Sequence, residues 1–143
     1  MHSTVQSHDV LSVFVSIFNH CLQSKKKIGV FPYDQYIISY LSFFYKQGYI
    51  LSYKQCSYFS ENGSTKETYI FVWFKLYENL SVIRFLKLYS KPSKRIYMSY
   101  KKVKYYSSHY KNKKTLVSTV SGLLYLNDCL FRKMGGLLLF EIL

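Results

Sequence analysis

The chain has 143 residues, with 20 lysines and arginines against 7 aspartates and glutamates, so its formal net charge is +13. Hydrophobic residues make up 49% of it, which is enough for a packed core and argues against intrinsic disorder. The charge favours a polyanionic partner, with nucleic acid first and an anionic membrane surface second.

The first half of the chain alternates between helical and strand patterns. Asp9 is predicted to cap a helix over residues 10–21, whose apolar positions have helical spacing, although their β-branched side chains would also suit a strand. A short strand is predicted at residues 28–31. A second helix is predicted between Asp34, as its cap, and Gly48, as its stop.

Two more strands are predicted at residues 49–58 and 68–76, joined by a turn at residues 61–64 that contains an Asn-Gly pair. The order helix–strand–helix–strand–strand predicts an α/β sandwich with both helices on one face of the sheet. Residues 78–79 are interpreted as a hinge. The chain is therefore expected to be an α/β (α+β) protein of two small domains, the first of which covers residues 1–78.

The second domain, residues 79–143, is predicted to be mostly β with one short helix near residues 127–134. Gly122 can supply a positive φ to a hydroxyl-rich turn, and a glycine pair is expected to end the helix. The other predicted features are a strand at 80–89, a linker at 98–115, a strand from Leu116, the turn at 118–122, the glycine pair at 135–136 and a last strand at 137–143.

The basic residues are concentrated in the second half of the chain. Between Glu78 and Asp128 there is no acidic residue. Lysines at this density repel one another unless a polyanion neutralises them, so affinity for RNA should fall steeply with salt. The alternative is a solvated loop enriched in lysine by codon drift, but drift would not remove acids from this half alone. The basic residues of the interval are Arg84, Lys87, Lys91, Lys94, Arg95, Lys101, Lys102, Lys104, Lys111, Lys113 and Lys114.

Four motifs, in the right order, resemble the bacterial-type family of small-subunit ribosomal protein eight. Residues 118–122 resemble its Ser-Thr-Ser-x-Gly turn, and the glycine pair follows at the family's spacing. Residues 91–97 resemble its Arg-Pro-Gly-x-Arg-Ile-Tyr segment, and the intervals from Asp9 to Pro32 and from Pro32 to Gly48 match without a gap. Three departures stand in the C-terminal stretch, where Val120 replaces a serine, Leu137 replaces a glutamate, and Tyr125-Leu126 stands where Thr/Ser-Asp is usual.

The resemblance implies a structural protein that binds the central domain of small-subunit ribosomal RNA, assists its assembly and lies beside other small-subunit proteins. Small hydroxyls can enter the shallow RNA minor groove, where long side chains fit poorly. The alternatives are a turn that only ends a strand, and a Tyr97 that only packs in its domain. The residues expected to bind RNA are Ser118, Thr119, Ser121, Gly122, Tyr97, Arg95, Lys94, Lys91, Lys101, Lys102 and Lys104.

Catalysis finds no support in the sequence. A Gly-rich phosphate loop, a His-Glu-x-x-His motif and a nucleophile elbow are all absent. Cys21, Cys56 and Cys129 are too far apart for a metal or disulfide framework and are interpreted as free thiols. The four histidines lack carboxylate or cysteine partners at a telling spacing. We therefore expect no enzyme, no cofactor, no metal site and no small-molecule substrate.

A basic peripheral protein that binds an anionic membrane surface, or another RNA, is the alternative function. A membrane protein of this kind should have an amphipathic helix with lysines along one face, and the β-branched and turn-like residues of 94–114 argue against one. The longest nearly uncharged stretch, 115–127, is too short to span a bilayer.

The composition also suggests an origin. The chain has no alanine, three arginines and 16 tyrosines, a bias that A/T-rich codons would produce. Residues 1–9 do not resemble a secretory signal or an arginine-rich transit peptide. We therefore expect an organelle-encoded protein of a mitochondrial ribosome.

Overall fold

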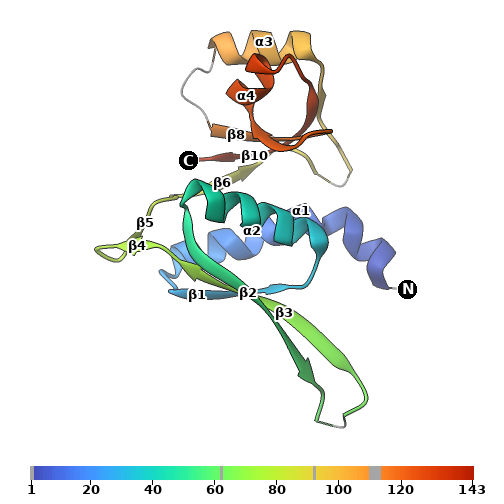
Figure 1. Cartoon of the computed structure of the whole chain (residues 1–143), viewed down its shortest axis with the longest axis vertical. Coiled ribbons are helices and arrows are strands. Elements are labelled where there is room, and N and C mark those ends of the chain that lie inside the picture. The colour runs from blue at the N-terminus through green and yellow to red at the C-terminus, as the bar shows by residue number, and fades with distance from the viewer. Residues whose placement is uncertain (1, 62, 92, 110–113) are drawn as a thin grey trace. The chain divides into compact units, whose positions relative to one another are not determined.

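The computed structural model describes residues 2–61, 63–91, 93–109 and 114–143. Its contacts divide the chain into two compact units, and Figure 1 shows the elements of each. The middle unit consists of residues 16–82, and the terminal unit combines residues 2–15 with residues 83–143. The described residues form four helices and several antiparallel sheets, so the expected mixed α+β class is confirmed.

The middle unit contains a three-stranded antiparallel sheet of order β1-β3-β2, with β1 at Ile28–Pro32, β2 at Ile50–Phe59 and β3 at Lys66–Phe74. Helix α2 (Gln35–Gln47) and the part of α1 (His2–Gln23) that belongs to this unit, residues 16–23, cover one face of this sheet (Figure 1). The predicted order of helices and strands is therefore confirmed for this part.

Phe18 on α1 lies at the centre of the middle unit's core. Its ring centroid lies 5.2 Å from those of Phe44 on α2 and Phe74 on β3, and 6.4 Å from that of Phe31 on β1. The contacts with Phe44 and Phe74 are edge-to-face, a geometry that adds to the free energy gained by burying the rings.

The predicted ends of α2 are confirmed. The Asp34 side chain accepts a 2.8 Å hydrogen bond from the Tyr36 N–H, and Gly48 adopts the left-handed conformation with φ of 80°. The predicted cap at Asp9 is wrong, because α1 already begins at His2. No proline or glycine interrupts residues 2–23, so the helix continues through this position.

The predicted strand at 80–89 is wrong as a single element. Residues Leu76–Tyr77 (β4) and Leu80–Ser81 (β5) form a small hairpin, and its two turn residues have positive φ, as a type I′ turn requires. The chain then leaves strand geometry and resumes as β6, Leu86–Leu88. Between β5 and β6, the Arg84 N–H donates a 2.8 Å hydrogen bond to the Leu143 carbonyl, and the Phe85 carbonyl accepts one of 2.9 Å from the Leu143 N–H.

The predicted Asn-Gly turn includes Asn62, which lies outside the described residues.

The terminal unit contains a sheet of order β6-β10-β8-β9, with β8 at Lys114–Thr119, β9 at Gly122–Tyr125 and β10 at Gly136–Ile142. A short strand β7, Tyr97–Met98, also pairs with the start of β10. Strand β10 therefore bonds to three other strands and is central to the unit.

Both faces of this sheet are partly covered. On one face Phe140 of β10 contacts Phe14 of α1, with ring centroids 6.0 Å apart. The other face packs against α3 (Tyr100–His109) and α4 (Leu126–Phe131). The core on this helix-covered face consists of Met98, Val103, Val117, Leu126 and Cys129.

The prediction of one short helix in residues 79–143 is wrong, because the structure has two. Helix α4 lies near the predicted position, and α3 lies within the predicted linker at 98–115. Val103 and Ser107, one helical turn apart, are the buried positions among residues 100–107 of this helix. Helix α4 ends at Phe131, earlier than predicted, and Lys133 takes the left-handed conformation (φ 56°) that was expected of glycine. Bonds from the Lys133 and Met134 N–H groups to Leu130 and Cys129 close this end as a Schellman motif.

Candidate RNA-binding surface

The hydroxyl-rich turn joins β8 to β9 and is held by one side chain. The Thr119 hydroxyl donates a 2.8 Å hydrogen bond to the Gly122 carbonyl and accepts one of 3.1 Å from the Ser121 N–H. Gly122 has a φ of 101°, which L side chains rarely adopt. The turn is therefore fixed from within, and Val120 at its tip is 98% exposed.

Ser118 belongs to a row of side chains that crosses four strands. Tyr97 of β7 lies opposite Leu137 of β10, Leu137 lies opposite Ser118 of β8, and Ser118 lies opposite Leu123 of β9. Residues opposite each other in antiparallel strands point to the same face of the sheet. We call this set the four-strand row. Tyr97 is 69% exposed and the other three are half-buried, so the row is accessible to a partner.

The glycine pair brings these strands together. A Cβ on Gly135 would clash with the Met98 carbonyl oxygen, and a Cβ on Gly136 would clash with that of Ser118. Neither glycine has a positive φ. They are required for the close approach of β10 to β7 and β8 rather than for ending a helix.

The segment before β7 is anchored to β10 by Ser90, which is fully buried. Its hydroxyl donates to the Leu138 carbonyl and accepts a 3.1 Å bond from the Ile96 N–H. Leu138 returns an N–H bond of 2.9 Å to the Ile96 carbonyl. The half-buried Arg95 and the exposed Tyr97 are therefore carried on a rigid segment.

Lys91 and Lys94 form a bridge with each other through backbone hydrogen bonds of 3.0 Å in both directions. Both side chains are exposed. Like charges directly opposite each other destabilise a strand pair. This arrangement favours a bound anion that neutralises both.

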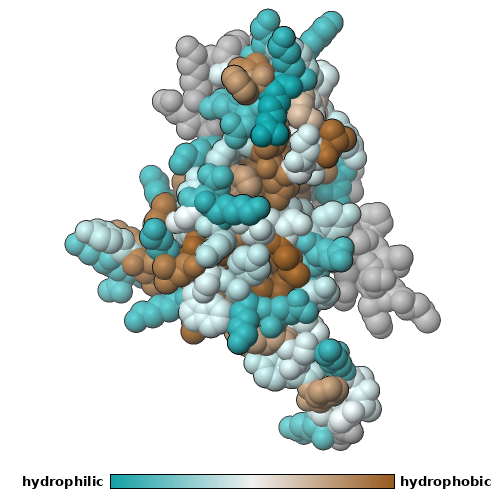
Figure 2. Space-filling view, viewed as in Figure 1, coloured by the Kyte–Doolittle hydropathy of each residue, from teal (hydrophilic) through white to brown (hydrophobic). Residues whose placement is uncertain are grey.

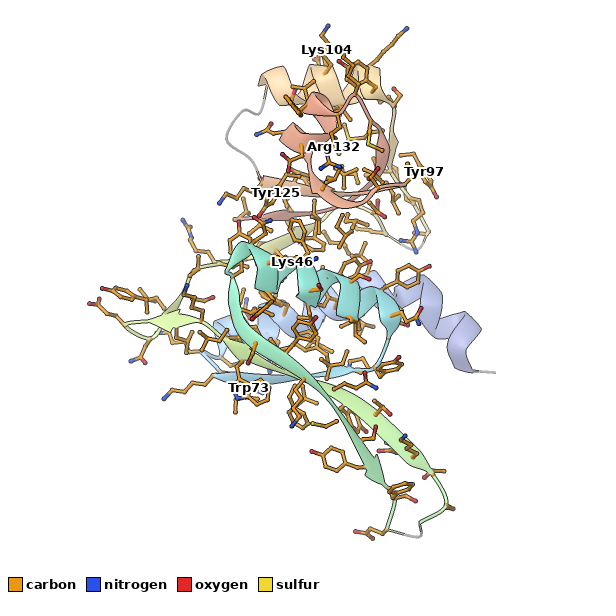
Figure 3. The ribbon with its side chains drawn as sticks, viewed as in Figure 1. Lys46, Trp73, Tyr97, Lys104, Tyr125 and Arg132 are labelled. Atoms are coloured by element: carbon orange, nitrogen blue, oxygen red, sulfur yellow. The ribbon has the colours of Figure 1, made fainter. Side chains whose placement is uncertain are left out.

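Lys101, Lys102 and Lys104 are exposed on α3, next to the buried Val103. Figure 2 shows hydrophilic side chains over this helix, and Figure 3 shows Lys104 pointing away from the rest of the unit. Val103 packs with Met98 and Val117, which point to the opposite face from the four-strand row. The structure therefore places the three lysines of α3 on the opposite side of this sheet from Tyr97 and Ser118.

Negative charge is nearly absent from the surface of residues 83–143. Their two acids are Asp128, which is exposed in the first turn of α4, and Glu141, which is 1% exposed. The buried Glu141 carboxylate accepts a hydrogen bond from the Tyr89 hydroxyl. Phosphates approaching either basic surface would therefore meet little repulsion.

A metal site, a membrane span and a membrane-binding helix would each require a particular feature in the described part of the chain. No group of three histidine, cysteine or acidic side chains in it could hold a metal ion. Among the described helices, none has the length and apolarity needed to cross a membrane. The predicted absence of a lysine-bearing amphipathic helix was wrong, since α3 is one, but its buried stripe is occupied by the protein's own core.

Residues 9–143 match the family model described as Ribosomal protein S8. The chain belongs to the ribosomal protein S8 family. It is therefore a structural protein of the small ribosomal subunit that binds ribosomal RNA, and it is not an enzyme. A comparison with curated proteins gives no significant match.

Some features of this S8 chain had no clear signal in the sequence. The four-strand row includes Leu137 and Leu123, which were not predicted as site residues, because their strand register depends on the glycine pair. Ser90 was also missed, since a lone serine before a basic segment is common. Helix α3 offered no apolar repeat, because one of the two buried positions among its described side chains is a serine, Ser107.

Proposed function

We propose that the chain binds the central domain of small-subunit ribosomal RNA through the four-strand row and the adjoining turn, and so assists assembly of that domain. The four-strand row carries the proposal, because its strands are paired with one another and the turn beside it is held by its own hydrogen bonds. A surface fixed in advance avoids the entropy that a flexible loop would lose on binding.

The roles of the turn residues differ in this proposal. Ser118, in the row, contacts the RNA minor groove with its hydroxyl, and Ser121 offers a second hydroxyl on the exposed side of the turn. Thr119 keeps the turn in shape, since its donated bond is already used within the protein. Gly122 permits the backbone conformation, and Tyr97 lies against a sugar or base.

The lysines and Arg95 supply most of the affinity by neutralising phosphates, with little dependence on base sequence. Lys91, Lys94 and Arg95 lie on the segment that leads into β7. Lys101, Lys102 and Lys104 neutralise RNA that packs against α3, across the sheet from the turn.

We further propose that the chain works in an organelle ribosome, most simply a mitochondrial one, and is encoded in that organelle. The lack of alanine and the abundance of tyrosine support this origin. The coding sequence tests it directly. A balanced base composition, or a product found outside organelles, would contradict it.

Binding of the purified full-length chain to its own central-domain transcript tests the main proposal. We expect a clear preference over an arbitrary duplex of equal length, together with sedimentation of the chain with small subunits in magnesium. Ribonuclease treatment should abolish that sedimentation. Equal affinity for both RNAs, or absence from the particle, would contradict the proposal.

A further inference from the structure

The outer face of the middle unit's sheet is apolar and uncovered by the described elements of that unit. Both helices lie on the inner face, where Phe31, Ile70 and Val72 are buried. The alternate residues of the strands point the other way. On β1 these are Ile28 and Val30, which are 46% and 47% exposed.

Register shows how this face is built. Ile28 lies opposite Trp73, and Val30 lies opposite Phe71 of the central strand, which in turn lies opposite Lys54 of β2. The Phe71 ring lies 6.5 Å from that of Trp73. Figure 3 shows Trp73 on the side of the sheet away from α2.

A second ring contact extends this face along the β2–β3 hairpin. The Tyr58 ring centroid lies 6.4 Å from that of Phe71. Strand β1 pairs with β3 only from Tyr69 to Trp73, so the hairpin beyond is two strands wide. A two-stranded hairpin is marginally stable alone, and an exposed apolar patch of this kind marks an interaction site.

The charge of this outer face distinguishes between partners. Its outward side chains on the three strands include one lysine, Lys54, and one acid, Glu67, so its formal charge is zero in a chain of +13. Surfaces that stack single-stranded RNA combine aromatic rings with a positively charged groove. The rings are present here without the groove, which disfavours RNA.

A second copy of the chain is disfavoured by charge as well, because each copy carries +13 and like charges repel. Lysines do lie at one end of this sheet. Lys27 precedes the first residue of β1, Lys75 follows the last residue of β3, and both are exposed. A partner with an apolar centre and acidic residues at its edge would match this distribution.

We propose that the outer face of the β1-β3-β2 sheet docks a neighbouring protein of the small subunit, which presents an apolar patch with an acidic edge. This inference rests on the proposed function in one respect, namely that the chain is incorporated into the particle. Three strands about 4.8 Å apart make a small face. Such a contact is weak between two free proteins and effective once RNA holds both in place.

A photoreactive phenylalanine analogue at position 30 of the full-length chain tests the proposal in isolated small subunits. We expect ultraviolet light to link it to another small-subunit protein, at an apolar surface that adjoins acidic residues, and the link to survive ribonuclease. A link to RNA, a link to a second copy or no link at all would overturn the proposal.

The matched pair Val30→Lys and Val82→Lys gives a second measurement, since Val30 is 47% and Val82 54% exposed. Strand β1 is an edge strand, where lysine is well tolerated. We expect Val30→Lys to reduce occupancy in salt-washed subunits by about tenfold, or 1.4 kcal/mol, and Val82→Lys to change it less than about twofold. Equal effects would overturn the proposal.

Failure of this inference differs from failure of the proposed function. A chain that enters the particle but links to RNA from position 30 contradicts the docking surface alone. A chain that never sediments with small subunits contradicts both.

Discussion

Gly136 and Ser118 approach each other so closely that no side chain fits on Gly136. A Cβ there would clash with the Ser118 carbonyl oxygen and lie 3.0 Å from both the Ser118 carbonyl carbon and Val117 Cγ1. Backbone atoms of a paired strand cannot yield as a flexible side chain can. We therefore expect Gly136→Ala to lower the free energy of unfolding by about 1–3 kcal/mol, as overpacking does. Urea denaturation measures this.

The same variant should also weaken RNA binding, because it moves β10 away from the strand that carries Ser118. Gly63→Ala is the control. Gly63 has a φ of 67° with nothing near its Cβ position, and it lies in the middle unit. It should lose stability through backbone strain alone and keep its affinity for RNA when folded. Equal losses of RNA affinity in both variants would show that the glycine contact has no special role.

Removing the hydroxyl of Thr119 should weaken RNA binding without removing a direct contact. Thr119→Val keeps the shape but loses both hydrogen bonds of the turn, so we expect a loss of about 1 kcal/mol in affinity. Thr119→Ser retains the hydroxyl and should restore most of it. Filter binding to the central-domain transcript measures both. A serine variant as weak as the valine variant would contradict this role.

Ser118→Ala combined with Thr119→Ala should weaken binding to the same transcript by about 1–3 kcal/mol, as buried hydrogen bonds are lost. Isothermal titration at fixed salt measures this difference. Because no phosphate contact is removed, the slope of affinity against salt should stay constant. Unchanged affinity would place the recognition surface elsewhere.

Lys94→Gln should stabilise the free protein and weaken its complex with RNA. In the free protein it removes repulsion from Lys91 across the bridge, so the free energy of unfolding should rise by about 0.2–1 kcal/mol. In the complex it removes a phosphate contact, so affinity should fall and the salt slope should decrease by about 1. Thermal denaturation and a salt titration test the two halves. Unchanged stability would contradict the repulsion, and an unchanged slope would contradict the contact.

The buried thiols should react slowly and only at high pH. Burial raises the pKa of Cys129 above its ordinary value of 9.0, with a further increase from Asp128, and burial also raises that of Cys21. The thiolate is the reactive form, so native alkylation at pH 8 should modify the half-exposed Cys56 first. Mass spectrometry of the modified peptides measures the order. Faster reaction at Cys129 would contradict it.

These raised pKa values also fix the sign of a stability change. The folded state favours the protonated thiols, so their contribution is complete below about pH 9 and is lost as the pH rises through the folded-state pKa. Stability should therefore decline in alkaline solution. Serine at positions 21 and 129 should reduce this decline.

Sequence patterns predicted the helices and strands of the middle unit well, because the residues that begin and end each element are close together in the sequence. Asp34 and Gly48 define α2 by hydrogen bonds within a few residues of each end. Helix α3 was missed because its tyrosines and lysines have no obvious apolar periodicity. Its register is set by one buried valine, Val103, that packs against residues far along the chain.

The site was predicted in part for the same reason. A turn of serine, threonine and glycine is visible in five consecutive residues. The position of this turn beside Tyr97 depends on Gly135 and Gly136, which come after it in the chain. These glycines act by letting β10 lie close to β7 and β8. Such a relationship cannot be predicted from spacing alone. The placement of the α3 lysines across the sheet from Ser118 also follows from packing, since it requires knowing which face of the sheet α3 covers.

Strand β10 has a consequence for the order in which the protein is made. Residues 16–82 leave the translating ribosome early and can fold while synthesis continues, as units of a chain generally do. The terminal unit must wait, because β6, β7 and β8 all pair with the last described strand to emerge. Until β10 emerges, the hydroxyl-rich turn has been synthesised, but β8, which leads into it, lacks its partner strand. The nascent chain should thus become competent for its transcript only after β10 has left the ribosome.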